Sequence, residues 1–342
     1  MEGCRANRTG DLVTLPPAPP PIDAHIMNLI QLAVREDLGD PAAPLHGDRT
    51  VELSIPADQK VTARIVARSP GIIAGTPLLP AILGEYEPNE PLTSCVIQTA
   101  DASHVTANQS IAEFSGPART LLSAERVMLN FLCHLSGVAT LTRRFVDAVS
   151  PVSATNEGRP FICDTRKTMP GFRALEKYAV RCGGGVNHRM GLYDGVMLKD
   201  NHLAALRDRL GEGGAGTLAQ LTGKIREELD PAILLWLEVD TLEQLKEALH
   251  VSRGGDGRRG ADIILLDNFT TKQMAEAVKL RDKAAAVQAK LKKPGGKMLL
   301  EASGGVTLDT VLAVAETGVD RISIGALTHS APILDLSMEF LS

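Results

Sequence analysis

The chain has 342 residues, of which 44% are hydrophobic and 23% charged, so it is long enough for one large or two moderate globular domains. A formal net charge of −5, with only three Tyr and one Trp, argues against a general nucleic-acid surface, which needs a basic face and stacking aromatics. Five scattered cysteines without a Cys-x-x-Cys pair indicate neither a disulfide framework nor a zinc cluster, and they favour a reducing, cytoplasmic location.

The first 21 residues end in the run PPAPPP and lack the continuous apolar core of a secretory signal. We interpret residues 1–21 as a flexible or polyproline arm. No apolar run along the chain approaches the roughly 18 residues of a spanning helix, so no membrane segment is expected.

The first third of the chain mixes helical and strand patterns without regular alternation. Ile22 to Leu38 has apolar residues at helical spacing, with Asp23 as the expected N-cap and Gly39 as the stop. Strands are expected over 61–66 and 72–74, further strands within 94–114 are broken by Asp101 and Asn108, and a short helix is expected over 77–83. This mixture predicts a separate α+β layer.

A long helical region over 117–149 follows and is expected to link two domains. Pro117 suits its start, and Gly137 predicts a break between two helices.

Beyond this region strands and helices alternate, which is typical of parallel βα units. The expected strands cover 161–164, 195–199, 233–239, 262–267, 298–302 and 321–325. The expected helices cover 172–179, 203–210, 241–249, 271–292 and 308–317. Glycine-rich runs over 211–216 and 254–260 look like surface insertions.

Polar residues follow almost every one of these strands. They are Asp164 with Arg166, Lys199 with Asp200, Glu238 with Asp240, Asp267 with Asn268, Glu301 with Ser303, and Gly325 with His329. Functional groups on all strands around a ring favour a barrel, because an open sheet concentrates them at its switch point. With six strands, fewer than the eight of a full barrel, the barrel is expected to be short or partly open.

Five cationic or potentially cationic residues fall at strand ends or in the glycine-rich patch GGGVNHR. Thr165, Arg166 and Lys167 follow one strand, His188 and Arg189 lie in the patch, and Lys199 follows the next strand. A guanidinium presents paired donors that suit a carboxylate or phosphate, so a strongly anionic ligand is expected. The alternative is pairing with Asp164, Asp194 and Asp200, and for His188 a ring packed in its loop.

Glu238 and Asp267 end consecutive strands. They suit a hard cation such as Mg²⁺, ribose hydroxyls, or ion pairs with nearby lysines and arginines. Ser303, Gly304 and Gly305 lead from a strand into a helix and suit a phosphate, although an ordinary turn has the same pattern. Without a P-loop or an evident nucleophile beside a base, group transfer by positioning and electrostatics is favoured.

The stretch from Asp164 to His202 closely resembles the signature region of the quinolinate phosphoribosyltransferase family. Similarity extends from about Ile22 to the C-terminus and includes SAERVMLNFLCHLSGVAT, WLEVD, ILLDNF, LEASGGV and ISIGALTHS. The resemblance implies that quinolinate and phosphoribosyl pyrophosphate react with Mg²⁺ to give nicotinate mononucleotide, pyrophosphate and CO₂ in NAD synthesis.

The resemblance also implies an α/β fold with an N-terminal α/β sandwich over 22–125, joined by the tail 331–342, and an incomplete parallel α/β barrel over 126–330. It implies a homodimer in which each sandwich caps the partner's barrel, with a homohexamer as a larger assembly.

The resemblance assigns roles by matching position. Arg166, Arg189, His188 and Lys199 would hold the quinolinate carboxylates, with Arg119 from the neighbouring subunit. Lys167 would face the phosphoribosyl substrate, Glu238 and Asp267 its ribose and metal, and Thr165, Ser303, Gly304, Gly305, Gly325 and His329 complete the substrate site. Lys167, Lys199, Glu238 and Asp267 are the expected catalytic residues. The rival functions are a non-decarboxylating nicotinate phosphoribosyltransferase and a non-catalytic barrel that binds a phosphorylated metabolite.

Overall fold

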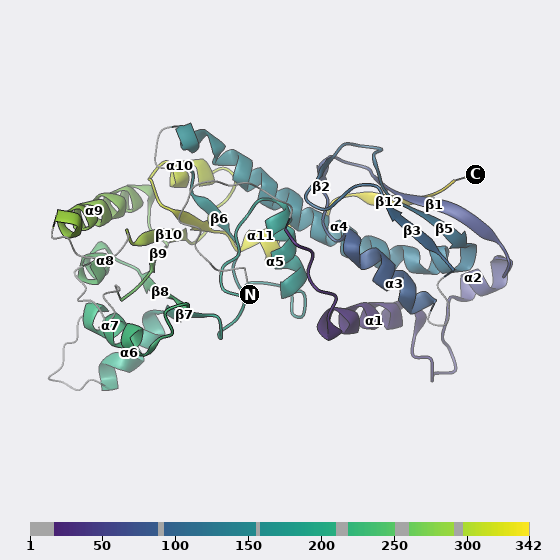
Figure 1. The fold of residues 1–342 in the computed structure, drawn as a ribbon, viewed down its shortest axis with the longest axis horizontal. Coiled ribbons are helices and arrows are strands. Elements are labelled where there is room, and N and C mark those ends of the chain that lie inside the picture. Colours follow the sequence, from purple (N-terminus) through teal and green to yellow (C-terminus); the bar gives the residue numbers. More distant parts are fainter. Residues whose placement is uncertain are drawn as a thin grey trace. The chain divides into compact units, whose positions relative to one another are not determined.

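A computed structural model describes residues 17–87, 92–154, 158–209, 218–249, 260–290 and 297–341 (Figure 1). These residues form two compact units. The barrel unit comprises Arg144–Arg166 and Val186–Gly325, and the sandwich unit comprises the described residues up to Arg143, Lys167–Gly185 and those from Ala326 onward. Most of the proline-rich arm and of the two glycine-rich insertions lies outside the described residues.

The sandwich unit is built on an antiparallel sheet with the order β12-β1-β5-β3. Its strands are β1 (Lys60–Ala67), β3 (Ser94–Ile97), β5 (Ser110–Pro117) and β12 (Leu336–Leu341), and a small second sheet pairs β2 (Gly71–Ile72) with β4 (His104–Val105). The C-terminal strand β12 lies along β1, with Leu341 opposite Thr62 (Figure 1). The helical elements are α1 (Ala24–Leu38), α2 (Arg49–Ser54), η1 (Thr76–Leu78) and α3 (Leu79–Tyr86).

Helix α1 shows that the sequence signals for its ends are correct. The carboxylate of Asp23 accepts a hydrogen bond from the backbone N–H of Ile26 at 3.0 Å, as an N-cap does. Gly39 ends the helix with φ 80°, a conformation that glycine adopts without strain. The buried face of the helix carries Ile26, Ile30 and Val34.

Helix α4 (Ala118–Ala148) is continuous, so the predicted break at Gly137 is wrong. A Cβ atom at Gly137 would lie 2.2 Å from the carbonyl oxygen of Pro332 and 2.9 Å from Cα of Ile333. The glycine therefore allows the C-terminal segment to cross close over the helix, and packing rather than chain reversal explains it.

The barrel unit contains a six-stranded parallel sheet, which confirms the predicted strand count and fold class. The strands are β6 (Phe161–Cys163), β7 (Gly195–Leu198), β8 (Leu234–Val239), β9 (Ile263–Asp267), β10 (Leu299–Ser303) and β11 (Arg321–Ser323). Their order is β6-β11-β10-β9-β8-β7, so the first two strands along the chain stand at the two edges. At the free edge of β6, Val186 forms a parallel bridge with Cys163, and the loop after it enters the barrel unit there.

Helices follow these strands, and two connections differ from regular alternation: the helix after β6 belongs to the other unit, and two helices lie between β7 and β8. The helices are α5 (Arg173–Cys182), α6 (Asp200–Arg209), α7 (Leu218–Glu228), α8 (Leu242–Leu249), α9 (Thr271–Lys290), α10 (Val311–Ala315) and α11 (Ala326–His329), with η2 (Ser150–Ala154) after α4. Helix α5 follows β6 in sequence but belongs to the sandwich unit, where it packs against α11. Helix α7 was not predicted from the sequence. Among the described residues, no helix is long and apolar enough to cross a membrane.

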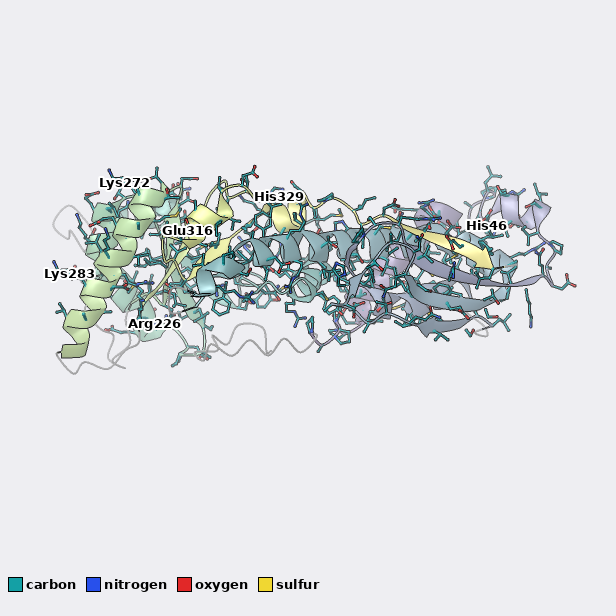
Figure 2. All side chains as sticks on the ribbon, turned by 90° about the horizontal axis from the view of Figure 1, so that it is seen from above. His46, Arg226, Lys272, Lys283, Glu316 and His329 are labelled. Atoms are coloured by element: carbon teal, nitrogen blue, oxygen red, sulfur yellow. The ribbon has the colours of Figure 1, made fainter. Side chains whose placement is uncertain are left out.

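The loops that enter β9 and β11 carry the same buried arrangement twice. Asp262 accepts hydrogen bonds from the backbone N–H of Leu235 at 2.8 Å and from the guanidinium of Arg226. Asp320 likewise accepts from the backbone N–H of Leu300 at 2.7 Å and from the guanidinium of Arg281. The two arginine side chains are only 1% and 2% exposed. These ion pairs, which we call the Asp–Arg clamps, tie helices α7 and α9 to the amino-terminal end of the sheet (Figure 2 labels Arg226).

Candidate active site

Strand register brings the predicted carboxylates to one face of the sheet. Glu238, Leu265 and Glu301 are paired across β8, β9 and β10, and Asp267 is paired with Ser303 two residues further along. Because strand side chains alternate between faces, residues two apart share a face. Glu238, Asp267, Glu301 and Ser303 therefore point the same way, near the carboxyl ends of their strands.

The glycine-rich loop is fixed to the end of β6 by a buried aspartate. Asp164 accepts hydrogen bonds from the backbone N–H of His188 at 2.9 Å and from the side-chain amide of Asn187 at 2.6 Å. Asp194, at the other end of the loop, accepts from the backbone N–H groups of Met190 and Gly191, both at 2.8 Å. These aspartates, which the sequence offered as ion-pair partners, thus organise the loop backbone.

Arg189 is a buried cation at this loop, with 6% of its surface exposed. One guanidinium nitrogen, Nη1, donates to the carbonyl oxygen of Gly195 at 2.8 Å. Burial lowers the pKa of Arg189, the positive charge of Arg166 lowers it further, and Asp194 opposes both effects. Two guanidinium groups therefore lie close enough to repel each other, and this arrangement suits an anionic ligand.

The position of Gly195, at the start of β7, explains why the guanidinium of Arg189 can reach a backbone carbonyl. A Cβ atom there would lie 2.9 Å from the ring of Trp236 and 3.2 Å from Cβ of Arg189. Any side chain at this residue would displace one of these two neighbours, so glycine permits the close approach.

His188 is buried, with 7% of its surface exposed, and both ring nitrogens contact protein groups. Nδ1 accepts the backbone N–H of Arg189 at 2.8 Å, Nε2 lies 3.3 Å from Oε1 of Glu301, and the ring centroid is 4.6 Å from that of Trp236. The ring thus fills the packed role that the sequence left open for it. Its direct contact with a substrate carboxylate stays a prediction.

Lys199 and Glu238 form an ion pair at the ends of β7 and β8, with Nζ 2.6 Å from Oε2. The glutamate side chain is 9% exposed and the lysine side chain 43%. An ion pair with a nearby lysine is one of the three interpretations that the sequence offers for Glu238. The half-exposed ammonium group remains accessible to a ligand at the sheet end.

Asp267 and the Ser303–Gly305 loop are linked by Asn268, a residue to which the sequence assigned no role in the site. Its amide donates to Oδ2 of Asp267 at 2.9 Å, and its backbone N–H donates to the carbonyl of Ser303 at 3.0 Å. Asn268 has φ 55°, Gly304 φ 101° and Gly305 φ 60°. A Cβ atom at Gly304 would lie 2.2 Å from Oδ1 of Asn268, so glycine is required there. The signal was the pair Asp-Asn at a strand end, since Asn tolerates left-handed backbone.

Lys167 and His329 belong to the sandwich unit, whereas Thr165, Arg166 and Gly325 belong to the barrel unit. The carbonyl of Lys167 accepts a hydrogen bond from Thr328 at 2.7 Å, next to His329. Nε of Arg173 donates to the hydroxyl of Thr168 at 3.1 Å, and the carboxylate of Glu176 accepts the backbone N–H of Met169 at 3.1 Å. Together with Thr328, these side chains fix the loop that follows Arg166. Lys167, Arg166 and His329 are exposed, Thr165 and Gly325 half-buried, and Figure 2 shows His329 at α11.

Arg119 lies in the first turn of α4, in the sandwich unit. Its Nε donates to the carbonyl of Ile55 at 2.8 Å and its Nη2 to that of Glu52 at 3.3 Å. Two carbonyl groups thus fix the direction of a half-buried guanidinium. Its role toward a neighbouring subunit stays a prediction.

The carboxylates suit a cation that a phosphorylated ligand helps to hold. In the described part of the chain, His, Cys, Asp and Glu side chains form no group of three or more that would bind a metal. Mg²⁺ is commonly bound by one or two carboxylates together with substrate phosphates. Glu238 and Asp267 supply those carboxylates, so they fit such a shared site.

Comparisons with known proteins agree over nearly the whole chain. Family models described as quinolinate phosphoribosyl transferase match residues 48–136 with the N-terminal domain and 138–339 with the C-terminal domain. A nicotinate-nucleotide pyrophosphorylase [carboxylating] of Mycobacterium leprae is 39% identical over 91% of this chain and 95% of its own length. A probable enzyme of the same name from Bacillus subtilis is 39% identical over 89% of each chain. The crystal structure of NadC from Streptococcus pyogenes superposes with a TM-score of 0.74 at 31% identity, covering 93% of this chain and 97% of its own.

Proposed function

Because this chain belongs to the quinolinate phosphoribosyltransferase family, we propose that the cations at its barrel mouth bind the two carboxylates of quinolinate. The chain is a pentosyltransferase of NAD biosynthesis. It transfers the phosphoribosyl group of phosphoribosyl pyrophosphate to quinolinate, releasing pyrophosphate and CO₂ and giving nicotinate mononucleotide.

The observation that carries the assignment of the binding site is the charge around Arg189. This guanidinium is buried, and the charge of Arg166 acts on it, so bringing a dianion there removes a repulsion as well as forming charge-assisted hydrogen bonds. Lys199 supplies a third, half-exposed cation. Nicotinate, with one carboxylate, would leave part of this charge unmatched.

The phosphoribosyl substrate is assigned to the carboxylates of Glu238 and Asp267 and to the loop at Ser303–Gly305. We assign Glu238 and Asp267 to the ribose hydroxyls, Lys167 to the diphosphate, and Thr165, Ser303, Gly304, Gly305, Gly325 and His329 to the remaining phosphate contacts. The left-handed backbone at Gly304 and Gly305, held by Asn268, supports a loop whose N–H groups face a phosphate. Glu238 and Asp267 would also hold Mg²⁺, which offsets the charge of the diphosphate when bound.

Bond making and breaking follow from this placement. As pyrophosphate leaves, C1 of the ribose gains positive character, which the carboxylates of Glu238 and Asp267 stabilise. The pyridine nitrogen then attacks C1. When the adjacent carboxylate departs as CO₂, its bonding electron pair stays on the ring carbon, where the neighbouring pyridinium nitrogen stabilises it, and a proton from water then completes the C–H bond. No protein acid or base is assigned to this step.

The rival functions differ in their products. With quinolinate, phosphoribosyl pyrophosphate and Mg²⁺, the purified chain should release CO₂ and pyrophosphate in equal amounts, and nicotinate in place of quinolinate should release little pyrophosphate. Pyrophosphate release with nicotinate and not with quinolinate would favour the non-decarboxylating enzyme. Ligand binding without pyrophosphate release would favour a sensor.

We also propose that the active sites are shared within a homodimer, with a homohexamer as a larger assembly, and that the enzyme works in the cytoplasm. Support for sharing comes from Arg119, whose guanidinium is held in one direction by two carbonyls. Support for a reducing location comes from four free cysteines among the described residues.

Mixing inactive subunits tests the sharing. Arg119→Ala and Lys199→Ala subunits should each be inactive alone and recover part of the activity when unfolded, mixed and refolded together, because one site in each mixed dimer regains both residues. Two Lys199→Ala preparations treated in the same way are the control. No recovery in the mixture would rule out the shared site.

A further inference from the structure

Glu301 lies inside the barrel unit and contacts four polar side chains: two from β11, one from β8 and one from the glycine-rich loop. Its Oε2 accepts from Nε of Arg321 at 2.8 Å and from Nε1 of Trp236 at 3.3 Å. Its Oε1 accepts from the hydroxyl of Ser323 and lies 3.3 Å from Nε2 of His188. The carboxylate is fully buried, and the site assigned above does not use it.

A buried carboxylate would pick up a proton unless its partners favour the charged form. Burial tends to raise the pKa of Glu301, but the charge of Arg321, with His188 and the Ser323 hydroxyl, lowers it below the usual 4.5. Glu301 is therefore an acceptor on both oxygens at neutral pH. Because an ionised carboxylate can only accept hydrogen bonds, each atom that is hydrogen-bonded to it must carry the hydrogen.

His188 is the neighbour for which this requirement has a consequence. Its Nδ1 accepts the backbone N–H of Arg189 at 2.8 Å, so in the neutral ring the hydrogen must be on Nε2, which faces Glu301. The Trp236 ring packs against the imidazole, with 4.6 Å between the ring centroids, and restricts the rotation of the imidazole. Glu301 thus selects the tautomer that lets His188 hold the backbone of Arg189.

Arg189 depends on this contact because hydrogen bonds hold it at both ends: its backbone N–H donates to Nδ1 of His188, and its Nη1 donates to the carbonyl oxygen of Gly195. We propose that Glu301 is a positioning residue for quinolinate, acting through the His188 tautomer on Arg189. This inference rests on the proposed function of Arg189. It assigns Glu301 no contact with the substrate.

Glu301→Gln is a sharp test because it preserves size and replaces one acceptor by a donor. If the amide nitrogen replaces Oε2, it meets the two donors of Arg321 and Trp236. If it replaces Oε1, it meets Nε2–H of His188, and the imidazole must move its hydrogen to Nδ1, which then faces the N–H of Arg189. Either orientation breaks a bond, and the second breaks the His188–Arg189 contact. Ser323→Ala is the matched control, since it removes one donor and keeps the carboxylate.

The expected result is a separation of the two substrates. Glu301→Gln should raise the quinolinate KM at least tenfold and leave the KM for phosphoribosyl pyrophosphate within about twofold, while Ser323→Ala changes neither KM by more than about twofold. Nitrogen-15 NMR of histidine-labelled protein should find His188 as the Nε2–H tautomer in the wild type and altered in Glu301→Gln. The His188→Asn variant identifies its signal.

Three results would overturn the inference. They are a wild-type His188 with its hydrogen on Nδ1, an altered tautomer with an unchanged quinolinate KM, and equal rises in both KM values. If Glu301→Gln does not fold, the wild-type tautomer decides, with the loss of selective quinolinate binding in His188→Asn as the second measurement. CO₂ release from quinolinate by the wild type tests the proposed function separately, so failure of one is distinguishable from failure of the other.

Discussion

The two ends of the barrel unit use the same residue types in opposite ways. At the amino-terminal end of the sheet, the Asp–Arg clamps match each buried guanidinium with an aspartate, Arg226 with Asp262 and Arg281 with Asp320. At the carboxyl end, Arg189 lies near Arg166, and the nearby Asp194 binds loop amides. An arginine that is paired with an aspartate stabilises the fold, whereas positive charge without a carboxylate partner of its own is available to bind an anionic ligand. A buried arginine is therefore informative only together with its partners.

The largest expected effect is on stability at the clamp end. Arg281→Ala should lower the free energy of unfolding by about 3–5 kcal/mol, because Asp320 would lose its buried partner. The quinolinate KM of the folded variant should be unchanged. Urea unfolding and steady-state kinetics measure the two. Lys272→Ala and Lys283→Ala, at exposed positions of the same helix α9 (Figure 2), are the controls and should change neither.

Arg189→Ala should affect catalysis more than stability, the reverse of Arg281→Ala. Loss of a charge-assisted contact to a buried dianion should lower kcat/KM for quinolinate by about 1.5–3 kcal/mol, roughly 10- to 150-fold, mainly through KM. The free energy of unfolding should fall by less than in Arg281→Ala, since a repulsion with Arg166 also disappears. A variant with unchanged kinetics and a large loss of stability would show that this end, too, is structural.

Gly195→Ala sharpens the comparison by changing only packing. The new methyl group would meet the Trp236 ring and Arg189, and overpacking of this kind costs about 1–3 kcal/mol. Because Arg189 must move, the quinolinate KM should rise while the KM for phosphoribosyl pyrophosphate stays constant. Gly158→Ala tests the reverse case, because the space around that glycine is open although its φ is 125°. It should affect stability and neither KM.

The smallest expected effect is on the pH dependence of the free energy of unfolding, and it concerns Glu301. Its pKa in the folded protein lies below the usual 4.5, so its charged form contributes stability above about pH 4.5 and loses it as the pH falls further. The difference in unfolding free energy between wild type and Glu301→Gln should therefore be constant near neutral pH and shrink by about 1.4 kcal/mol per unit in the acid range. Urea titrations at several pH values measure it. A constant difference down to about pH 3 would mean that folding does not lower the pKa of Glu301.

The fold of the barrel unit was accessible from the sequence because each strand is a short apolar run that ends in polar residues. The same local reasoning failed at Gly137, since the atom that requires glycine there belongs to Pro332, far along the chain. The clamps were also missed. Arg281 and Asp320 are separated by 39 residues, and no local pattern distinguishes their contact from two surface charges.

The sequence was sufficient to predict several residues of the site, but it did not predict which of them contact each other. Strand ends and the glycine patch indicated Arg166, Arg189 and Lys199 as cations. The roles of Asn268 and Glu301 depend on strand register: Glu301 appeared as one more polar residue near a strand end, while the structure pairs it with Leu265 and buries it beside His188. A sequence shows which groups are present, and only the pairing of strands shows which of them meet.

Strand β12 has a consequence for how the protein is made. Its partner β1 is synthesised early and β12 last, and every strand of the barrel unit is translated between them. During synthesis, one edge of β1 therefore stays unpaired until β12 emerges, and an unpaired edge is where nascent chains associate wrongly. The sandwich sheet, which begins before the barrel unit is made, can be completed only after the barrel strands have been translated.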